Sequence, residues 1–599
     1  MNVLGAASWL YLKYSIRQER SHACPHLRFI ALIPNLQTTS KVSVSEASST
    51  MAVMRAEPDG YDMAKIQLMG RQAAGHGFLR AAVQARGDNP VHAFTGTNRA
   101  AEGFKAIVRK IDPTATVEWI HTEHLHRVAD VGVLFLADAT VASHAKMRQR
   151  VGLTAFSFCG VTHTTATHGA MDEIAGLLRE PVAPWDALIC TSTSVAETVR
   201  RIHEAEADYL RWRLGPEVRI QGPQLPLIPL GVHCDDFVFS EATRTAARTA
   251  LALEADEVAC LFTGRLVFHA KAHPHAMFRG LQLAAQRSGK RLALILSGWF
   301  PNADIEAAFR DGARDFAPDV RLIVIDGRQP VGREHSWAAA DLFISLSDSI
   351  QETFGLTPIE AMAAALPVVV TDWDGYKDTV RDGVDGFRVR TWAPDGGAGV
   401  ALARAHENQT LNYDSYCWAA TAATAVDMGQ VAEAVATLAA NPDLRRRMGE
   451  AGRARARAIY DWRVVFHQHQ ELWADLNARR RAAAADPALQ DHLGRMPRAS
   501  SARLDPFHAF GHYPTELLTP QTRLALAPGV TRADLTVVLN HALFSGLAFP
   551  ASKAEDVFGA LESAGPATLT ETATRLNANL ALITRAAALL VKAGLVGAH

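Results

Sequence analysis

Two glutamates, Glu352 and Glu360, flank a Phe-Gly-Leu turn at residues 354–356. A strand-like run at 341–347 precedes them, and a helix-like, alanine-rich run follows them. Backbone N–H groups at the start of a helix can hold a phosphate, and carboxylates accept hydrogen bonds from hydroxyl groups. Because a nucleotide sugar carries both kinds of group, this segment indicates that the chain binds such a compound.

A capping box is an alternative explanation of Glu360 alone. Thr357 would be the N-cap residue, Pro358 the first helical position and Glu360 the third. The carboxylate would then only satisfy backbone donors of its own helix. This alternative leaves Glu352 and Gly355 unexplained, so the interpretation depends on the rest of the chain.

Length and composition are typical of a globular protein with several domains. With 599 residues, about three or four domains are expected. The chain is 48% hydrophobic and 21% charged, and its net charge of −1 gives no general attraction to nucleic acid or to an anionic membrane. No apolar run reaches the roughly 18 residues that predict a membrane span.

The cysteines predict neither a disulfide framework nor a zinc site. Six of them lie far apart in the chain: Cys24, Cys159, Cys190, Cys234, Cys260 and Cys417. None forms a Cys-x-x-Cys pair, so we expect reduced thiols in a cytoplasmic protein, with peripheral membrane association left open.

Residues 1–57 differ from the rest of the chain and are expected to form a disordered extension. Their short apolar piece at 3–14 has neither the preceding basic residues nor the cleavage site of a signal peptide. A serine-rich tract then leads to Met51, which is an alternative start of translation.

From about residue 60, strand-like and helix-like segments alternate, which predicts βαβ units and a parallel sheet. Strands are expected at 66–69, 92–95, 117–120, 131–136, 155–159 and 187–191. The glycine-rich segment at 70–77 is not G-x-G-x-x-G, and no acidic residue follows at the distance of a ribose-binding one. A nicotinamide-dependent dehydrogenase is therefore disfavoured.

The same alternation restarts after a proline- and glycine-containing linker at 226–233. Strands are expected at 259–262, 292–296, 320–325, 342–345 and 367–371. The expected fold is α/β, with two doubly wound, Rossmann-like domains facing a cleft and a C-terminal α-helical extension. In such domains a ligand binds at the carboxyl ends of the strands.

Four blocks of the chain, in this order and spacing, resemble glycosyltransferase family 4, the retaining nucleotide-sugar transferases of GT-B fold (glycosyl transferases group 1). They are 262–266 with Lys271, 352–362, 366–372 and 380–387. The resemblance covers about residues 60–480. Its last part, 460–463 with 472–473, is similar to the helix that crosses back to the first domain in this fold.

The chain is expected to have five parts, of which the resemblance covers the two central domains. The expected parts are an extension at 1–57, an acceptor domain at 58–235, a donor domain at 236–480, a linker at 481–514 and an all-helical accessory domain at 515–599. The last part weakly resembles the end of a winged helix-turn-helix. It is poor in basic residues, and the chain ends where a wing should follow, so no nucleic-acid binding is expected. A dimerisation or protein-interaction role is the preferred interpretation.

The resemblance assigns the donor diphosphate to Arg265 and Lys271, which follow the turn at Gly264. A guanidinium fork and a mobile ammonium both suit phosphate oxygens. Two cations can also stabilise a leaving diphosphate, so we expect no metal and no cofactor beyond the nucleotide-diphosphate sugar itself. The alternative is a surface charge pair on a loop.

The resemblance also assigns the remaining donor contacts. Glu360 corresponds to the residue that binds the ribose hydroxyls and Glu352 to the residue that contacts the sugar. The other expected donor-binding residues are Phe354, Gly355, Leu356, Ser297, Gly298 and, near the base, Arg328.

In the first domain, His163 resembles the family histidine that is presented to the donor sugar, and His168 is a competing candidate. An ordinary hydrogen-bonded histidine is the alternative. Gly75, with Gly70 and Gly77, resembles the glycine loop that approaches the diphosphate, although Ala73 and Ala74 stand where adjacent glycines are commoner.

The reaction implied by the resemblance is transfer of a sugar, of hexosyltransferase type, to an acceptor hydroxyl with retention. The catalytic candidates are Glu352, His163, Arg265 and Lys271. The acceptor could be a sugar, a lipid or a small molecule. The alternatives are a nucleotide-sugar-binding regulatory protein without transfer activity, and an epimerase or phosphorylase of the same architecture. Residues 393–428 exceed a minimal connection and either border the acceptor site or form a surface excursion.

Overall fold

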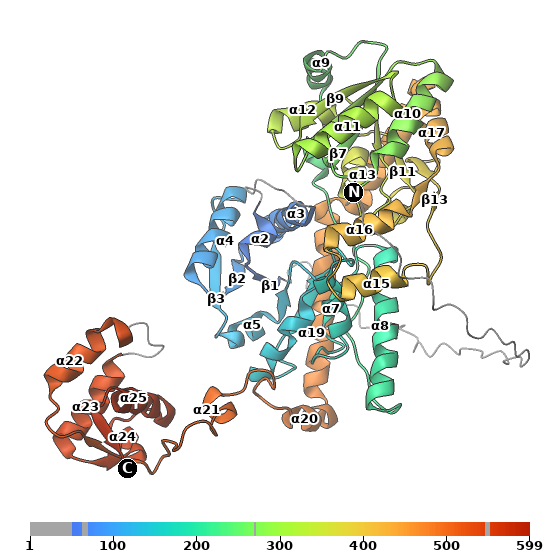
Figure 1. Ribbon diagram of the computed structural model, residues 1–599. Coiled ribbons are helices and arrows are strands. Elements are labelled where there is room, and N and C mark those ends of the chain that lie inside the picture. The colour runs from blue at the N-terminus through green and yellow to red at the C-terminus, as the bar shows by residue number, and fades with distance from the viewer. Residues whose placement is uncertain (1–50, 63–69, 269–270, 545–550) are drawn as a thin grey trace, which may run out of the picture. The chain divides into compact units, whose positions relative to one another are not determined.

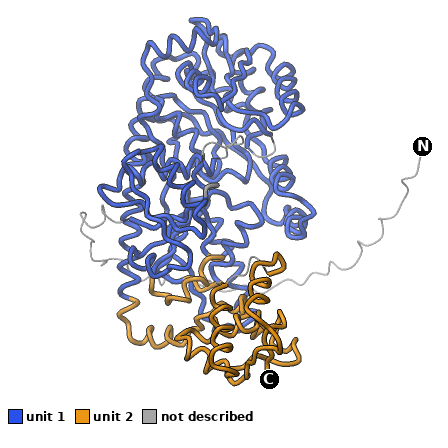
Figure 2. Tube along the Cα trace, turned by 90° about the vertical axis from the view of Figure 1, so that its left-hand side faces the viewer, with its two compact units in different colours: residues 1–141, 156–178, 183–482 blue, residues 142–155, 179–182, 483–599 orange. Residues whose placement is uncertain are grey.

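The computed structural model describes residues 51–62, 70–268, 271–544 and 551–599. These residues fall into two compact units, shown in Figure 2. Unit 1 comprises 1–141, 156–178 and 183–482, and unit 2 comprises 142–155, 179–182 and 483–599. None of the helices in the described ranges is long and apolar enough to cross a membrane.

The first sheet is parallel, with strand order β3-β2-β1-β4-β5-β6. Its strands are β1 (Val53–Arg55), β2 (Val91–Thr95), β3 (Val117–His121), β4 (Val133–Phe135), β5 (Ser157–Val161) and β6 (Ala187–Ile189). In register, Met54 lies opposite Ala93 on one side and Phe135 on the other. The prediction of a doubly wound parallel sheet is confirmed for this domain.

The central strand β1 lies inside the segment that the sequence assigned to a disordered extension. Ala52, Val53, Met54 and Ala56 are at most 1% exposed. The limit at residue 57 is therefore wrong, and the first domain includes β1. The error arose because three residues buried on both faces give no alternation of apolar and polar positions. The strand expected at 66–69 lies outside the described residues.

The second sheet is also parallel, with order β12-β11-β10-β7-β8-β9. Its strands are β7 (Val258–Arg265), β8 (Leu292–Trp299), β9 (Val320–Asp326), β10 (Leu342–Ser345), β11 (Val368–Thr371) and β12 (Gly386–Val389). Helices α10 (Pro274–Ser288), α11 (Ala303–Phe316) and α12 (Pro330–Ala339) lie against it (Figure 1). Strands buried on both faces read as continuous apolar runs, as in β10 and β11.

The last helix of this part, α19 (Trp462–Ala485), returns from the second domain to the first (Figure 1). Trp462, Phe466 and Trp473 belong to the core of the first sheet. At the crossing, Val232 of the interdomain linker pairs with Asp461 in a short parallel bridge. The predicted closing helix is confirmed.

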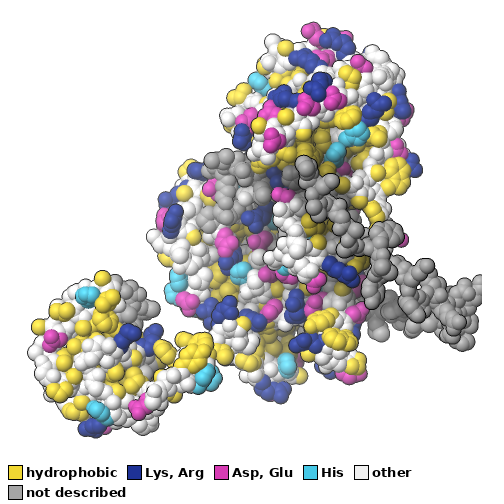
Figure 3. Space-filling model, viewed as in Figure 1, with side chains coloured by type: hydrophobic (Ala, Val, Ile, Leu, Met, Phe, Trp, Pro, Cys, Tyr) yellow, Lys and Arg dark blue, Asp and Glu magenta, His cyan; other side chains and the backbone are white. Residues whose placement is uncertain are grey.

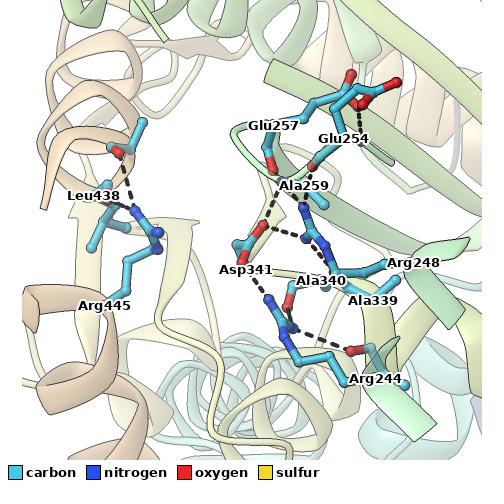
Figure 4. Close-up of polar contacts among 12 residues, drawn as sticks. Arg244, Arg248, Glu254, Glu257, Ala259, Ala339, Ala340, Asp341, Leu438 and Arg445 are labelled. Carbon is cyan, nitrogen blue, oxygen red and sulfur yellow. Dashed lines mark hydrogen bonds and ion pairs between the residues drawn. The ribbon is translucent and has the colours of Figure 1, made fainter. Parts of the chain in front are cut away.

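A cluster of ion pairs lies at the amino-terminal edge of the second sheet (Figure 4). Asp341, just before β10, accepts hydrogen bonds from Arg244 (2.6 Å), Arg248 (3.0 Å) and the backbone N–H of Ala259 (2.8 Å). Its side chain is 12% exposed and that of Arg248 is 17% exposed. The cluster joins α9 (Glu241–Ala250) to the starts of β7 and β10, far from the carboxyl ends of the strands.

Asp341→Ala is expected to lower the free energy of unfolding of this domain by about 3–5 kcal/mol, because two poorly solvated guanidinium groups lose their partner. The matched control is Asp256→Ala, since Asp256 pairs with Arg291 at the surface with 69% of its side chain exposed. Surface pairs contribute about 0–1 kcal/mol. Urea denaturation of both variants tests the difference, and equal midpoints would contradict it.

The C-terminal part of unit 2 combines helices with a small antiparallel sheet. Its helices are α22 (Arg532–Asn540), α23 (Ala551–Ala564), α24 (Leu569–Arg575) and α25 (Leu580–Lys592), which confirms the helical extension. The expectation that it is wholly helical needs correction, because β15 (Arg523–Leu526) pairs with both β16 (Ala567–Thr568) and β17 (Val596–Ala598). The central strand of this sheet, β15, precedes the helices in the chain. In a winged helix-turn-helix, by contrast, the corresponding strand would follow them.

The surface of this C-terminal module shown in Figure 3 is mostly hydrophobic and uncharged, with only scattered Lys and Arg side chains. Its core is formed by residues such as Leu524, Phe558 and Ile583. Two statements about this module stay predictions. It is expected not to bind nucleic acid, and it is expected to bind a protein partner or a second copy of this chain.

Candidate functional site

The carboxyl ends of β10, β7 and β8 are adjacent, because these strands are neighbours in the second sheet. In this order Gly264 pairs in register with Gly298 and Arg265 pairs with Trp299. The segment that contains Glu352 follows β10 on the other side of β7. Residues predicted from three separate blocks of the sequence are therefore brought together at one edge.

Lys271 and Glu352 form the central ion pair of this edge. Lys271 Nζ donates to Glu352 Oε2 over 2.8 Å, and the two side chains are 33% and 10% exposed. Burial acts to raise the pKa of Glu352, but Lys271 and the backbone N–H groups of Thr353 and Phe354 outweigh it and lower the pKa. Glu352 is thus an ionised carboxylate at neutral pH.

Arg265 lies beside this pair and completes the group of cations. Its Nη2 atom donates to Gln351 Oε1 over 3.1 Å, so the guanidinium is held by the residue next to Glu352. The phosphate-facing role of Arg265 and Lys271 stays a prediction. Their convergence on one loop shows that they are more than a dispersed surface charge pair.

Two glycines, Gly264 and Gly298, lie in close backbone contact at this edge. Gly264 has φ +143°, in the region that favours glycine. A Cβ atom on Gly298 would lie 1.9 Å from the carbonyl oxygen of Gly264. Ser297 is buried and its Oγ accepts from Ser336 Oγ over 2.9 Å, so its hydroxyl has a structural partner. Backbone atoms are what Ser297 and Gly298 can offer a ligand here.

The turn at 354–356 is fixed by its packing. Gly355 has φ +84° and is the N-cap of α13 (Leu356–Ala363). A Cβ atom on Gly355 would lie 2.0 Å from the ring of Tyr376, and one on Gly375 would lie 2.4 Å from Phe354 Cα. The first N–H groups of a helix have no partner within it, so the fixed start of α13 is available to bind an anion.

The capping-box explanation of Glu360 is wrong. Helix α13 starts at Leu356, so Thr357 and Pro358 lie inside its first turn and Thr357 is not the N-cap. The carboxyl group of Glu360 instead lies 3.4 Å from Arg333 of α12 and is 17% exposed. Burial raises its pKa, against the effect of Arg333 and Lys271. Glu360 is therefore directed toward other elements and not to its own helix start.

Glu360 borders a cavity of about 700 Å³ between the two Rossmann-like domains of unit 1. The second domain contributes Arg328 and Arg333, and the first domain and linker contribute His76 and His233. Arg328 is held by Asp326 through two contacts of 2.8 Å. The volume lies within the usual range for a small-molecule site, which agrees with the predicted positions of Glu360 and Arg328 on the nucleotide side.

His163 follows β5 and reaches the loop that holds Glu352. Its backbone carbonyl accepts from Thr353 Oγ1 over 3.0 Å. Burial lowers the pKa of His163 to about 4, so the imidazole is neutral at physiological pH. His168, at the start of α7 (His168–Gly176), pairs instead with Asp172 at 3.1 Å. Of the two histidines, His163 is the one that the fold brings to the Glu352 loop.

The predicted glycine loop is a helix. Gly70, Gly75 and Gly77 lie within α3 (Gly70–Ala85), and a Cβ atom on Gly75 would lie 2.0 Å from the carbonyl oxygen of Gly60. The structure thus gives Gly75 a packing role against α2 (Pro58–Tyr61). A glycine needed for close helix packing looks the same in sequence as one that approaches a phosphate. Residues 63–69, between β1 and α3, lie outside the described residues.

Two acidic residues of this edge were missed by sequence reasoning. Burial raises the pKa of Asp348 and of Asp374 to about 7 in both cases. Asp348 accepts from the backbone N–H of His273 over 3.1 Å. Asp374 has φ +42°, which is unusual for a residue other than glycine. An aspartate preceding Gly375 was the only local sign of this turn.

Residues 393–424 form an excursion whose base is closed by β13 (Thr391–Trp392) and β14 (Ala425–Val426). Its helices are α15 (Val400–Glu407) and α16 (Tyr413–Ala422). The ring of His406 lies 5.5 Å from that of His168 in the first domain, and Trp418 stacks on His273 at 5.8 Å in the second. The excursion therefore contacts both domains beside the loop of Lys271.

Among the described residues, no group of three or more His, Cys, Asp or Glu side chains is arranged to hold a metal ion. The described cysteines are all buried and free. Because burial raises the pKa of Cys260 well above its usual range, that thiol stays protonated.

A family model described as "Glycosyl transferases group 1" matches residues 257–404. The D-inositol 3-phosphate glycosyltransferase of Segniliparus rotundus is 27% identical over 264 residues, 43% of this chain and 56% of that protein. The one of Nocardioides sp. is 32% identical over 187 residues, 29% of this chain and 39% of that protein. The alpha-maltose-1-phosphate synthase of Mycolicibacterium smegmatis is 30% identical over 141 residues, 24% of this chain and 29% of that protein.

The chain spans about half the length of the first of these relatives and less than half of the other two. Among solved structures, Anabaena Alr3699/HepE in complex with UDP and glucose aligns with a TM-score of 0.46 and 14% identity, covering 71% of this chain and 99% of that one. Sucrose-phosphate synthase from Thermosynechococcus elongatus aligns with a TM-score of 0.41 and 18% identity, covering 73% and 98%.

Proposed function

We propose that this chain is a retaining glycosyltransferase, because residues 257–404 match the family model described as glycosyl transferases group 1. It moves a sugar, of hexose type, from a nucleotide-diphosphate sugar to an acceptor hydroxyl. The observation that carries the proposal is the partly buried Lys271–Glu352 pair, 2.8 Å apart, between Arg265 and the start of α13. Cations and a helix start can bind a diphosphate, and a carboxylate can accept hydrogen bonds from a sugar.

In this reaction the second domain binds the donor. Arg265 and Lys271 bind the diphosphate and stabilise the charge that develops on it as the sugar leaves. A diphosphate takes over part of the pairing that Lys271 makes with Glu352, and Glu352 then contacts the sugar. Glu360 accepts hydrogen bonds from the ribose, and the start of α13 contributes backbone N–H groups.

The acceptor hydroxyl attacks on the face that the diphosphate leaves, and the leaving phosphate oxygen takes its proton. The anomeric configuration is then retained. His163, neutral and close to Thr353, can hydrogen-bond to the sugar without adding charge. Protein side chains supply all the positive charge in this scheme, so neither a metal nor a cofactor is needed.

A thermal-shift screen of UDP, GDP and ADP and of their sugars tests the donor site. A shift with one nucleotide and its sugar, followed by transfer with retention seen by NMR, is the expected result. A specific shift without turnover would favour a regulatory binding protein, and an inverted product would contradict retention. Absence of any shift would refute the nucleotide site.

Glu360→Gln is expected to weaken binding of the selected nucleotide by roughly tenfold to a hundredfold, because hydrogen bonds to a charged group contribute about 1.5–3 kcal/mol. Isothermal titration calorimetry measures the change. The matched control is Glu334→Gln, since Glu334 lines the same cavity but is exposed. Equal effects of the two substitutions would show that only the charge of the cavity matters.

A further inference from the structure

Asp374 occupies a strained position in the loop after β11. Its φ of +42° lies in the left-handed region, which residues other than glycine rarely adopt. The next residue, Gly375, is locked against Phe354. An aspartate in such a place requires compensating contacts, and these come from the other domain.

Ser192, the N-cap of α8 (Thr193–Leu214) in the first domain, supplies these contacts. Its Oγ atom lies 2.8 Å from the carbonyl oxygen of Thr353 and 3.2 Å from Asp374 Oδ1. Thr353 directly follows Glu352, and its hydroxyl in turn donates to His163. A single hydroxyl of the first domain thus bridges the Glu352 loop and the Asp374 loop.

The protonation state of Asp374 decides whether this bridge is complete. The Ser192 hydroxyl has one hydrogen but two acceptors when Asp374 is a carboxylate. When Asp374 is protonated, its own O–H can donate to Ser192 Oγ, and the serine hydrogen is free for the Thr353 carbonyl. Only the protonated form therefore satisfies both contacts at once.

The surroundings of Asp374 oppose its ionisation. Burial is the largest cause of its raised pKa, and the negative charge of Glu352 is the second. Asp378 of α14 (Tyr376–Thr379) adds further negative charge, while the hydrogen bond from Ser192 acts in the opposite direction. No cation is among the groups that shift the pKa of Asp374, and Lys271 in the described residues pairs with Glu352 instead.

We propose that Asp374 is a positioning residue whose protonated carboxyl completes an Asp374–Ser192–Thr353 hydrogen-bond chain and so holds the Glu352 loop against the first domain. Ionisation breaks the chain and favours separation of the two domains, where the carboxylate can be hydrated. The importance of the Glu352 loop rests on the proposed function, whereas the chain itself can be tested without any ligand.

The direction of the pH dependence follows from the raised pKa. In the closed arrangement Asp374 titrates at about 7, and in water an aspartate titrates at about 3.9. Its contribution to closure is complete below the lower value and is lost as the pH rises through the higher one. Between these two values the closed-to-open ratio should fall about tenfold for each pH unit, and above about pH 7 it should level off, because Asp374 is then ionised in both arrangements.

Distances between spin labels on the two domains measure this ratio in the protein without ligand. Arg201→Cys on α8 and Arg314→Cys on α11 are suitable sites, with side chains 75% and 67% exposed. Cys24→Ser removes the one cysteine outside the described residues. The wild type should lose its short distance as the pH rises from about 5 to about 7.

Asp374→Asn should keep the short distance up to pH 9, because the amide can donate to Ser192 at every pH. Asp374→Gly relieves the backbone strain but removes the donor, so it should be more open than the wild type at pH 6 and insensitive to pH. The matched control is Asp378→Asn, which weakens another cross-domain contact, to Thr193 at 2.6 and 2.7 Å, but leaves the chain intact. It should still open as the pH rises, with the transition moved to lower pH because the negative charge of Asp378 no longer opposes ionisation of Asp374.

A pH-independent wild type, or an Asp374→Asn variant that opens like the wild type, would overturn the proposal. Once a donor is known, kcat/KM should fall as the pH rises from about 5 to about 7 in the wild type but not in Asp374→Asn. If no donor is turned over, the proposed function fails, while the distance measurements still decide the role of Asp374.

Discussion

Glu352→Gln is expected to lower kcat/KM for sugar transfer about 100-fold or more, the size of effect seen when one charge-stabilising group is removed from a transition state. Glu352 is buried, ionised and paired with Lys271. Glutamine keeps its shape but loses the charge that orients Lys271 and faces the sugar. Binding of the nucleotide diphosphate alone should change by no more than about threefold, since the sugar contact is lost selectively.

A double-mutant cycle with Lys271→Met separates the two roles of Glu352. If Glu352 acts mainly by holding Lys271, the second substitution should add little to the first. If it also contacts the sugar, the double variant should be slower than either single one. Undiminished transfer in Glu352→Gln, at unchanged thermal stability, would remove Glu352 from the mechanism.

The convergence of the candidate site could be predicted from the sequence because it depends on a general property of parallel sheets. Arg265 and Gly298 lie at the carboxyl ends of β7 and β8, and Glu352 follows β10. The carboxyl ends of neighbouring parallel strands meet at one edge. The blocks that carry the resemblance supplied the order of these strands. The apolar runs of the second domain were long enough to be recognised as strands without further context.

The features that the sequence did not reveal depend on contacts between distant segments. Ser192 and Asp374 are separated by 182 positions, and neither belongs to a block that carries the resemblance. The central strand β1 has three residues and is buried on both faces, so no pattern marks it. Gly75 and Gly298 are both glycines under close backbone contact, yet only Gly298 lies at the candidate site.

Local rules also failed where tertiary packing was stronger. The Thr-Pro-Ile-Glu sequence satisfies the pattern of a capping box. The helix nevertheless starts earlier, because Gly355 takes a left-handed conformation against Tyr376. The same glycine that releases Glu360 from a capping role thus fixes the helix start at the candidate phosphate site.

Gly355→Ala is therefore expected to reduce nucleotide binding about 100-fold and to lower the free energy of unfolding by about 2–4 kcal/mol, through overpacking and a left-handed alanine. The added Cβ would lie 2.0 Å from the ring of Tyr376. Tyr376 is 1% exposed, and its hydroxyl is hydrogen-bonded to Ser345 Oγ at 2.9 Å, so the ring cannot simply move aside. The start of α13 must shift instead, and its N–H groups shift with it.

Gly383→Ala separates the steric effect from backbone strain. Gly383 has a similar φ of +73°, but no atom lies within 4 Å of an added Cβ. Gly383→Ala should lower the free energy of unfolding only by the strain of a left-handed alanine, about 1 kcal/mol. Nucleotide binding measured by calorimetry should be unchanged. If both substitutions weaken binding equally, general destabilisation explains the loss. If only Gly355→Ala does, the position of the α13 start is what binds the nucleotide, since the two variants share their strain and differ in the contact with Tyr376.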